Sequence, residues 1–360
     1  MTSFPREDYR PLSPTDPGCS PVAVDLSDNT NLWGAHPAAL EVVRMAPPEA
    51  LTRYPSAYAS ELKDAVASKF GIGAENVVTG AGSSDLLDSA FRASTTPPGR
   101  ISFPAPTLSM VQPFAQMNGL EVIPVPWSKA EMDPARLLLE EPDLVYICRP
   151  NNPTGISLDR NWLRALLALG GSDGPLVILD EAHADFGGGD TFLEEAPSSD
   201  RLLVLRTFSA LYGLAGLRVG FAVGPRPLVE EVEKSRGPYK VSQIAQCAAI
   251  AALEDRSGWA GQIRREVLWN RERLADELRA RGLHPLPSQA NFLLIPVEPA
   301  SALEVNQALQ AHGVAGCPFP NSPDIGDAIR ITIGPWKLME KFLQALDQLF
   351  EARPPATETE

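Results

Sequence analysis

The sequence has little that would direct the protein to a membrane or to nucleic acid. Among its 360 residues, 31 Lys and Arg stand against 45 Asp and Glu, which gives a net charge of −14. Without a basic surplus, the surface has little with which to neutralise phosphates, so we expect no nucleic-acid partner. No apolar run approaches the roughly 20 residues that span a bilayer, so we expect no membrane partner. A local cationic pocket for a small anion stays compatible with this balance.

Cysteine is scarce, and its spacing points to no special chemistry. Cys19, Cys148, Cys247 and Cys317 are widely separated and form no Cys-x-x-Cys pair. Scattered cysteines of this kind are typical of reduced thiols in a cytoplasmic protein. The four histidines show no metal-ligand spacing, and the polar, proline-rich N-terminus lacks the apolar core of a signal peptide. We therefore predict a cytoplasmic protein without a metal site.

The length and the apolar pattern predict a two-domain α/β protein. A chain of 360 residues exceeds the usual size of one core. Short apolar runs alternate with helical stretches such as Ser84–Ala93 and Asn161–Leu169, which indicates a mainly parallel sheet covered by helices on both faces. The expected strands are Asn76–Thr79, Arg100–Phe103, Glu121–Val125, Leu144–Cys148, Leu176–Leu179, Leu202–Thr207 and Arg218–Val223.

The pattern changes after Pro238 and predicts a second, smaller α+β domain. A long helical region runs from about Gln243 to Arg281, with Glu and Arg at helical spacing. The elements expected after it are a strand at Ala290–Pro296, a helix at Ala302–His312, a strand at Ala328–Ile333 and a helix at Pro335–Glu351.

We predict three regions along the chain. Residues 1–50 hold an N-terminal arm and part of the small domain, residues 51–250 the large domain, and residues 251–360 the C-terminal small α+β domain. Residues 1–22 are rich in Pro and Ser and are expected to form an extended arm. The tail after Arg353 is expected to be disordered.

Four motifs fall at the ends of expected strands, where open α/β sheets bind ligands. The first is Thr79–Asp85, TGAGSSD, in which glycines between a strand and a helix let the backbone approach an anion. The second is Arg149–Gly155, RPNNPTG, where Asn152 would project an amide from a strand end. Either motif alone could be an ordinary turn.

The other two motifs carry charge. Asp180, in Asp180–His183, closes an apolar strand, and a buried carboxylate there needs a partner. A protonated pyridine nitrogen or a nearby arginine would serve. In the segment Arg206–Arg218, RTFSALYGLAGLR, Ser209 and Arg218 could clamp a phosphate.

The order and spacing of these motifs resemble a known family. From Asn152 to Asp180 is 28 positions, to position 210 another 30, and to Arg218 another 8. In this the chain, from about Leu26 to Leu349, resembles fold-type I enzymes that use pyridoxal 5′-phosphate (PLP), in the histidinol-phosphate aminotransferase-like branch. The resemblance implies the aspartate aminotransferase-like fold and PLP as cofactor.

The resemblance also implies a role for each motif residue. Asn152 would bond the pyridine O3′ and help to hold the substrate, Asp180 would pair with the ring nitrogen, and Arg330 would clamp the substrate carboxylate bidentately. The cofactor phosphate would be held by the backbone of Gly80, Ala81 and Gly82 together with Ser209 and Arg218. Tyr54 would reach the phosphate of a neighbouring subunit, which implies a homodimer with shared active sites.

Three positions depart from the family pattern. His183 stands where relatives place a tyrosine that donates to O3′, and an imidazole can donate there too. Leu108 lies where they place an aromatic residue beside the cofactor ring. The segment Gly313–Cys317 lacks the arginine that binds the substrate phosphate in histidinol-phosphate transaminases. We therefore do not expect histidinol phosphate to be the substrate.

The largest departure is Ala210, which occupies the position of the Schiff-base lysine. That lysine would anchor the cofactor and shuttle the proton at the substrate Cα, and alanine can do neither. Because Ser209 and Gly213–Arg218 keep the family pattern, we interpret Ala210 as an engineered replacement of lysine that traps an external aldimine. A natural lysine-less homologue is the alternative. Lys240 is either a substitute amine or a solvated side chain.

The predicted function is that of a PLP-dependent enzyme acting on an L-amino acid, with transamination as the first choice. The same site type also supports decarboxylation and β- or γ-elimination or replacement. The alternative hypothesis from another functional class is a non-catalytic PLP-binding protein.

Overall fold

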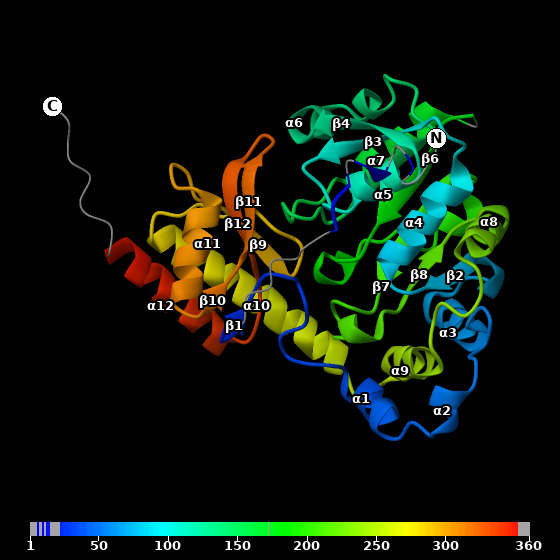
Figure 1. The fold of residues 1–360 in the computed structure, drawn as a ribbon, viewed down its shortest axis with the longest axis horizontal. Coiled ribbons are helices and arrows are strands. Elements are labelled where there is room, and N and C mark those ends of the chain that lie inside the picture. The colour runs from blue at the N-terminus through cyan, green and yellow to red at the C-terminus, as the bar shows by residue number, and fades with distance from the viewer. Residues whose placement is uncertain (1–5, 7–8, 11, 15–21, 172, 352–360) are drawn as a thin grey trace.

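The structure is a computed structural model that describes residues 6, 9–10, 12–14, 22–171 and 173–351. The predicted tail after Arg353 and most of the predicted arm over residues 1–22 lie outside these residues. Figure 1 shows a larger unit built around a sheet and a smaller unit beside it, connected along the long helix α10 (Trp259–Ala280). Among the described helices, none has both the length and the apolarity to cross a bilayer.

The larger unit contains a seven-stranded, mostly parallel sheet, which confirms the predicted fold class. The strand order is β2-β8-β7-β6-β5-β3-β4, and β8 runs antiparallel to both of its neighbours. Every strand expected in this region is present, with ends within two residues of those predicted. The strands are β2 (Val77–Gly80), β3 (Gly99–Ala105), β4 (Leu120–Pro126), β5 (Leu144–Cys148), β6 (Leu176–Asp180), β7 (Leu202–Thr207) and β8 (Gly220–Val223).

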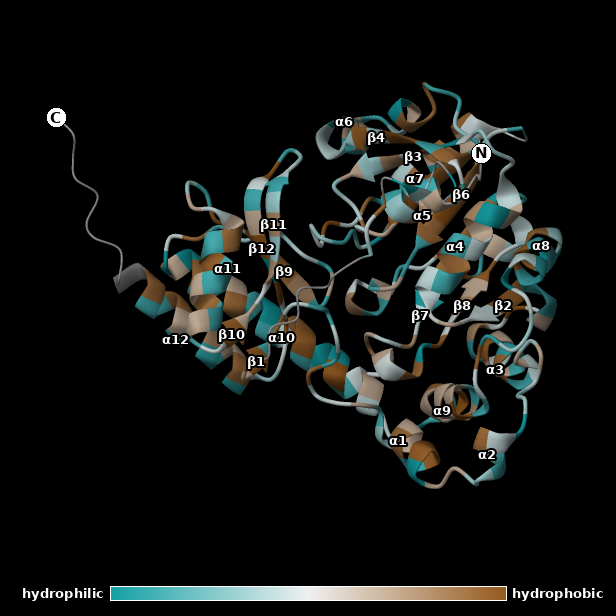
Figure 2. Cartoon of the chain, in the orientation of Figure 1, coloured by the Kyte–Doolittle hydropathy of each residue, from teal (hydrophilic) through white to brown (hydrophobic). Residues whose placement is uncertain are grey.

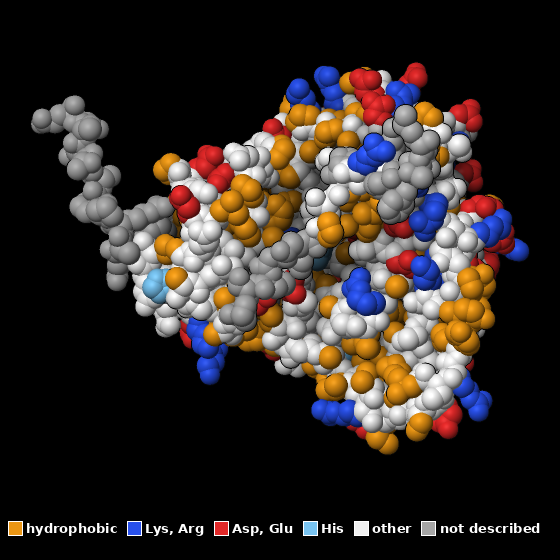
Figure 3. Space-filling model, viewed as in Figure 1, with side chains coloured by type: hydrophobic (Ala, Val, Ile, Leu, Met, Phe, Trp, Pro, Cys, Tyr) orange, Lys and Arg blue, Asp and Glu red, His pale blue; other side chains and the backbone are white. Residues whose placement is uncertain are grey.

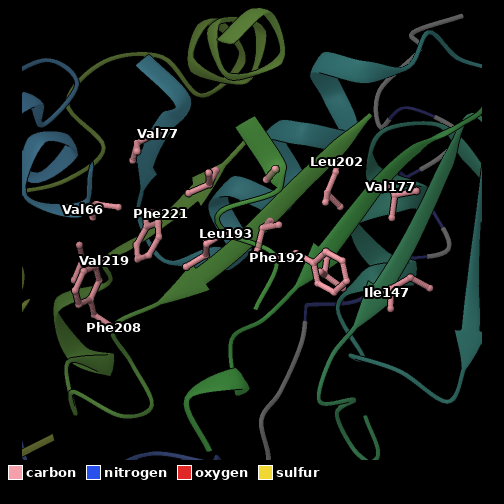
Figure 4. Close-up of a cluster of buried hydrophobic side chains, with 14 of the residues drawn as sticks. Val66, Val77, Ile147, Val177, Phe192, Leu193, Leu202, Phe208, Val219 and Phe221 are labelled. Atoms are coloured by element: carbon pink, nitrogen blue, oxygen red, sulfur yellow. The ribbon is translucent and has the colours of Figure 1, made fainter. Parts of the chain in front are cut away.

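Helices cover both faces of this sheet because its strands are apolar on both sides. Along β5, Leu144, Tyr146 and Cys148 enter one core, and Val145 and Ile147 enter the other. Figure 4 shows part of the second core, and Figure 2 shows the apolar strands running through the larger unit. The first core is covered by α4 (Ser83–Ser94), α5 (Val111–Met117) and α8 (Arg226–Arg236), the second by α3 (Ser60–Phe70), α7 (Arg160–Gly170) and α9 (Gln243–Glu254).

The smaller unit has its own core and two small sheets. β11 (Cys317–Ser322), β12 (Gly326–Thr332) and β9 (Phe292–Pro296) form an antiparallel sheet, and β1 (Val24–Asp25) pairs in parallel with β10 (Val314–Ala315). Helices α10, α11 (Ala302–Ala311) and α12 (Trp336–Glu351) pack around them. Through the pairing of β1 with β10, a strand of the N-terminal region lies beside this unit.

The helical region predicted from about Gln243 to Arg281 is present, but it consists of two helices. The structure divides it into α9, which ends at Glu254, and α10, which begins at Trp259. Gly258 between them has a φ of +81°, a left-handed conformation in which a helix cannot continue, and Ser257 bonds back to Asp255. The turn lets α10 leave the larger unit and enter the smaller one.

Several short elements were not predicted from the sequence. They include β1, β10 and the proline-containing strand β11, together with α3 and α5. The remaining ones are α8, α1 (Pro37–Arg44), α2 (Glu49–Thr52), α6 (Trp127–Met132) and the 3₁₀ turns Ala74–Asn76, Pro134–Leu137, Ala184–Phe186, Ala196–Ser198 and Ala215–Leu217.

Candidate active site

A cavity of about 280 Å³ lies at the carboxyl ends of β5, β6 and β7. Seven of the residues singled out in the sequence line it, namely Leu108, Asn152, Asp180, His183, Ser209, Ala210 and Arg218. Figure 3 shows the surface hollowed between the two units, and the cavity lies in this region. The cavity therefore occurs where parallel α/β sheets place their ligands.

Asp180 is a buried acid at the end of β6, with only 3% of its surface exposed. Its Oδ1 accepts the Ala182 N–H at 3.0 Å, and its Oδ2 accepts the Tyr146 hydroxyl at 2.9 Å. Burial raises the pKa of Asp180, while these two donors act in the opposite direction. Arg206, the nearest basic influence, is itself paired with Glu181. In the described chain Asp180 thus has donors but no ion-pair partner.

Arg330 lies on the central strand of the small antiparallel sheet and reaches across to the larger unit. It donates to Asn152 Oδ1 at 2.5 Å and to the Ser27 carbonyl at 2.6 Å. The rings of Phe292 and Phe319 lie 5.5 and 5.4 Å from its guanidinium carbon. Its Nε is buried and has no partner in the described chain, and burial lowers its pKa. A cation held in this way is suited to an anion brought by a ligand.

The Arg330 contact also orients the amide of Asn152. With Oδ1 occupied by the guanidinium, the donors of the amide nitrogen remain for a ligand in the cavity. The neighbouring Asn151 is fully buried and bonds Pro106 and Thr154, which fixes the loop. The structure thus separates a loop-building asparagine from a cavity-lining one.

His183 is an uncharged imidazole on the cavity wall. Burial, with a smaller contribution from Arg330, lowers its pKa from 6.5 to about 4. Its ring packs edge-on against that of Phe292, with 5.2 Å between the ring centroids. Its Nδ1 is buried and has no hydrogen-bond partner in the described chain. A neutral imidazole has one N–H and one lone pair, so at neutral pH His183 can donate only one hydrogen bond.

The glycine turn after β2 brings the backbone against Arg218. Gly82 has a φ of +84°, and a Cβ placed there would lie 2.5 Å from Arg218 Nη2. Both facts favour glycine at this position. Arg218 itself is exposed, has a φ of +49° and donates to the Ala215 carbonyl at 3.2 Å.

The amides free to bind an anion at this turn belong to serines that we had not singled out. The Ala81 N–H is taken by Asp85 Oδ2 at 3.0 Å, and the Gly82 N–H by the Gly80 carbonyl at 2.8 Å. Ser83 and Ser84 begin α4, so their amides have no carbonyl one turn earlier in the helix, and both residues line the cavity. An anion at this helix end would meet these two serines.

The segment after β7 places a methyl group at the cavity wall. Ser209 is coupled to Thr207, whose Oγ1 lies 3.0 Å from the Ser209 hydroxyl oxygen. Ala210 is 3% exposed and packs with Leu211 into the core of the smaller unit. The position lines the cavity but offers no amine.

Six of the residues singled out in the sequence do not line this cavity, namely Gly80, Ala81, Gly82, Arg330, Tyr54 and Lys240. Arg330 contacts the cavity through Asn152, as described above. Tyr54 is 86% exposed, with its ring 5.1 Å from that of Tyr239, and it lines a separate groove. Lys240 lies 3.4 Å from Asp85 Oδ1 and is partly exposed. Neither side chain lines the cavity within its own chain.

The cavity also includes residues that the sequence did not single out. Asp28, Asn29 and Thr30 come from the segment after β1, and their place depends on the pairing of β1 with β10. The remaining additions beside Ser83 and Ser84 are Cys148, Ala182, Thr207 and Ala215. Most of them adjoin a predicted site residue, so their closeness to the motifs was the available signal.

Comparisons with known proteins agree with this geometry. A family model described as aminotransferase class I and II matches residues 21–346. Histidinol-phosphate aminotransferase 1 of Bradyrhizobium diazoefficiens is 34% identical over 357 residues, which cover 97% of this chain and 100% of that protein. An aromatic amino acid aminotransferase of Streptomyces coelicolor is 33% identical over 350 residues, 94% of each chain.

A solved structure shows the same fold. The histidinol-phosphate aminotransferase of Sinorhizobium meliloti, crystallised in complex with pyridoxal 5′-phosphate, matches with a TM-score of 0.86 at 24% identity. The match covers 98% of this chain and 99% of that one.

Proposed function

The chain belongs to the aminotransferase class I and II family, and we propose on that premise that its cavity binds PLP and an L-amino acid. The observation that carries the proposal is Asp180, a buried carboxylate with two donors and no ion-pair partner in the described chain. A protonated ring nitrogen would supply the missing positive charge.

The other cavity residues fit the remaining parts of the cofactor. The amides that begin α4 at Ser83 and Ser84, with Ser209 and Arg218, would hold the phosphate. The φ of +84° at Gly82 favours glycine at the turn, where the backbone lies close to the Arg218 guanidinium. The Asn152 amide is oriented to donate to a ring hydroxyl. When bound, PLP supplies an electron-poor ring that weakens the bonds at the Cα of the amino acid.

The protein's own groups would bind and orient the amino acid. Arg330 would receive its α-carboxylate, because the guanidinium is buried, flanked by two phenylalanine rings and has an unpartnered Nε. Asp180 would keep the ring nitrogen protonated. At neutral pH, His183 would present a neutral ring to the same cavity.

Ala210 limits the chemistry of this chain. A methyl group cannot link to the cofactor and cannot accept or return a proton at Cα. We therefore propose that the cofactor is held without a covalent link, that an added amino acid remains bound, and that turnover is negligible. An engineered loss of lysine is our interpretation, and a natural non-catalytic homologue would show the same binding.

The substrate side chain is proposed to be free of phosphate. Cys317 occupies the position where histidinol-phosphate transaminases carry an arginine, and it pairs with Arg330 across the sheet. Burial raises the pKa of Cys317, Arg330 acts in the opposite direction, and Asp25 and Asp28 add smaller raising influences. The neutral thiol offers no charge to a substrate phosphate, and Arg330 is already assigned to the α-carboxylate.

A homodimer is proposed from the surface that carries Tyr54. A groove of about 510 Å³ between α2, the end of α1 and the start of α9 is lined mainly by apolar side chains, including Val42, Met45 and Ile244. Met45, Leu51 and Tyr54 are exposed there by 72%, 78% and 86%. Burying such side chains against a second copy would be favourable and would bring Tyr54 towards the other cavity.

The test is equilibrium dialysis with PLP, followed by absorbance spectra as L-amino acids are added. We expect saturable PLP binding and a spectral change that persists after the amino acid is added, with no keto acid, amine or ammonia released. Absence of PLP binding would overturn the cofactor assignment. In Ala210→Lys protein, the released product separates transamination from decarboxylation and elimination. Sedimentation analysis tests the dimer independently.

A further inference from the structure

Tyr146 is a polar side chain inside an apolar strand. It lies on β5, pairs with Ile178 of β6 in parallel register and has none of its surface exposed. Its hydroxyl donates to Asp180 Oδ2 at 2.9 Å. The bond links the middle of one strand to the end of the next, because Cys148, two residues beyond Tyr146, is opposite Asp180. The phenol thus donates to the acid of the proposed cofactor site, and the Cys148 thiol is its other polar neighbour.

We propose that Tyr146 is a positioning residue that holds Asp180 ionised and in place, so that the cavity selects a ligand with a protonated ring nitrogen. This inference rests on the proposed function, because Asp180 is the group through which Tyr146 would act. Tyr146 itself does not line the cavity.

The hydroxyl is a permanent donor. Burial raises the pKa of Tyr146 well above its usual value, and the Asp180 charge acts in the same direction. The phenol therefore stays protonated at neutral pH. For Asp180, burial favours the neutral acid, and the Ala182 amide and the Tyr146 hydroxyl are the hydrogen bonds that oppose it.

The other groups around Asp180 do not replace this donor. The Cys148 thiol donates to the Pro150 carbonyl, and burial beside Asp180 raises its pKa, so it is uncharged. Arg206 on β7 acts on Asp180 electrostatically but is bonded to Glu181 and Asp185. Glu181, the next residue, adds negative charge that disfavours ionised Asp180. Without the Tyr146 hydroxyl, Asp180 would keep only the Ala182 amide.

Tyr146→Phe removes the hydroxyl and keeps the ring. Asp180 Oδ2 then loses its donor, the neutral acid becomes more favourable, and binding a protonated ring nitrogen must first ionise the acid. A hydrogen bond to a charged group corresponds to about a 10- to 100-fold change in affinity. We expect PLP affinity to fall by about that factor. A ligand without a ring nitrogen has no use for the ionised acid and should be unaffected.

The experiment compares PLP with its deaza analogue, in which a CH group replaces the ring nitrogen. Dissociation constants are measured by equilibrium dialysis for the chain as it stands and for Tyr146→Phe. We expect weaker PLP binding by the variant and equal deaza-PLP binding by both proteins. In an Asp180→Asn background, Tyr146→Phe should leave PLP affinity unchanged, because the coupled acid is gone.

Two controls distinguish a positioning role of Tyr146 from a role in core packing alone. Tyr212→Phe removes another largely buried phenol, one that does not line the cavity, and should leave both affinities unchanged. The pH profile of PLP binding gives the second readout. Because loss of the donor raises the Asp180 pKa, the variant should lose PLP affinity at a higher pH than the parent as the solution is acidified.

The outcomes are distinct. If the parent binds neither ligand, the proposed function fails. If the parent binds PLP, and Tyr146→Phe lowers the affinity for both ligands equally or for neither, the role of Tyr146 is overturned. Should the variant not fold, tyrosine labelled with ¹³C at the phenol carbon is followed in the parent. PLP must then shift the Tyr146 signal and deaza-PLP must not, and equal shifts would refute the proposal.

Discussion

The two ends of the cavity are built in different ways. At the Asp180 end, both carboxylate oxygens receive donors from the same sheet and its adjoining turn. At the Arg330 end, the guanidinium bonds Asn152 of the larger unit and Ser27 of the N-terminal segment, and its Nε has no partner in the described chain. The difference indicates that the first end has its hydrogen bonds in place within one unit before a ligand arrives, whereas the second is assembled across units.

The largest effect is expected at Ala210, on the wall that the two ends share. Ala210→Lys restores an amine that can hold the cofactor covalently and move a proton at Cα. General acid–base chemistry of this kind contributes about 10²- to 10⁴-fold in rate. We expect keto acid formation from an L-amino acid to rise by at least that factor, measured by a coupled assay, and PLP to remain attached through gel filtration.

The matched control is Lys240→Met, made both in the parent chain and in Ala210→Lys protein. Lys240 forms a partly exposed ion pair with Asp85 and does not line the cavity, so its loss should change neither PLP binding nor turnover. Loss of activity or cofactor binding with Lys240→Met would show that it provides the substitute amine.

A smaller effect, confined to one end, is expected for Arg330→Gln. Losing the charge and the paired donors should weaken amino acid binding by about 2–3 kcal/mol, the usual value of charge-assisted hydrogen bonds. PLP affinity should fall by less than the amino acid affinity, because Arg330 does not line the cofactor cavity and reaches it only through Asn152. Titration of PLP-loaded protein with an L-amino acid measures the first quantity and dialysis the second. Equal losses of both affinities would contradict the separation of the two ends.

The smallest effect concerns pH and His183, which lines the cavity and is influenced by Arg330. Its folded pKa of about 4 is below the ordinary 6.5, so the unfolded chain binds a proton first as the pH falls. The contribution of neutral His183 to stability is fully present above pH 6.5 and declines as the pH drops towards 4. By pH 5.5 the loss is about 1 kcal/mol.

Urea denaturation at pH 7.5 and pH 5.5 measures this loss. The difference between the two pH values should be smaller in His183→Gln protein than in the parent, whereas the exposed His284→Gln should reproduce the parent. An unchanged difference in His183→Gln would show that the imidazole is already charged or solvated in the folded protein.

The sequence was most informative where short motifs follow apolar strands. Asn152 and Asp180 could be predicted because each follows a run with a clear strand pattern, and the structure places both at one cavity. Tyr146 could not be assigned a role, because inside Leu144–Cys148 it reads as one more core residue. Its contact with Asp180 depends on the register between β5 and β6.

Other features depended on contacts between distant segments. Asp28 reaches the cavity only because β1 pairs with a strand of the smaller unit. The division of the helical region before Trp259 depends on the left-handed conformation of one residue, Gly258. Ser83 and Ser84 were part of a motif noted in the sequence. Only the structure shows that the amides of Ala81 and Gly82 are already hydrogen-bonded, which leaves the serine amides to bind an anion.

The segment after β1 ties the cavity together by chain connectivity rather than by packing. Its Ser27 carbonyl receives Arg330, and four residues later the Asn31 amide donates to the Leu211 carbonyl at 2.7 Å, beside Ala210. One short segment of chain therefore contacts both Arg330, proposed to bind the substrate carboxylate, and the turn that holds position 210. In Ala210→Lys protein, the restored amine and Arg330 would both be placed by this segment.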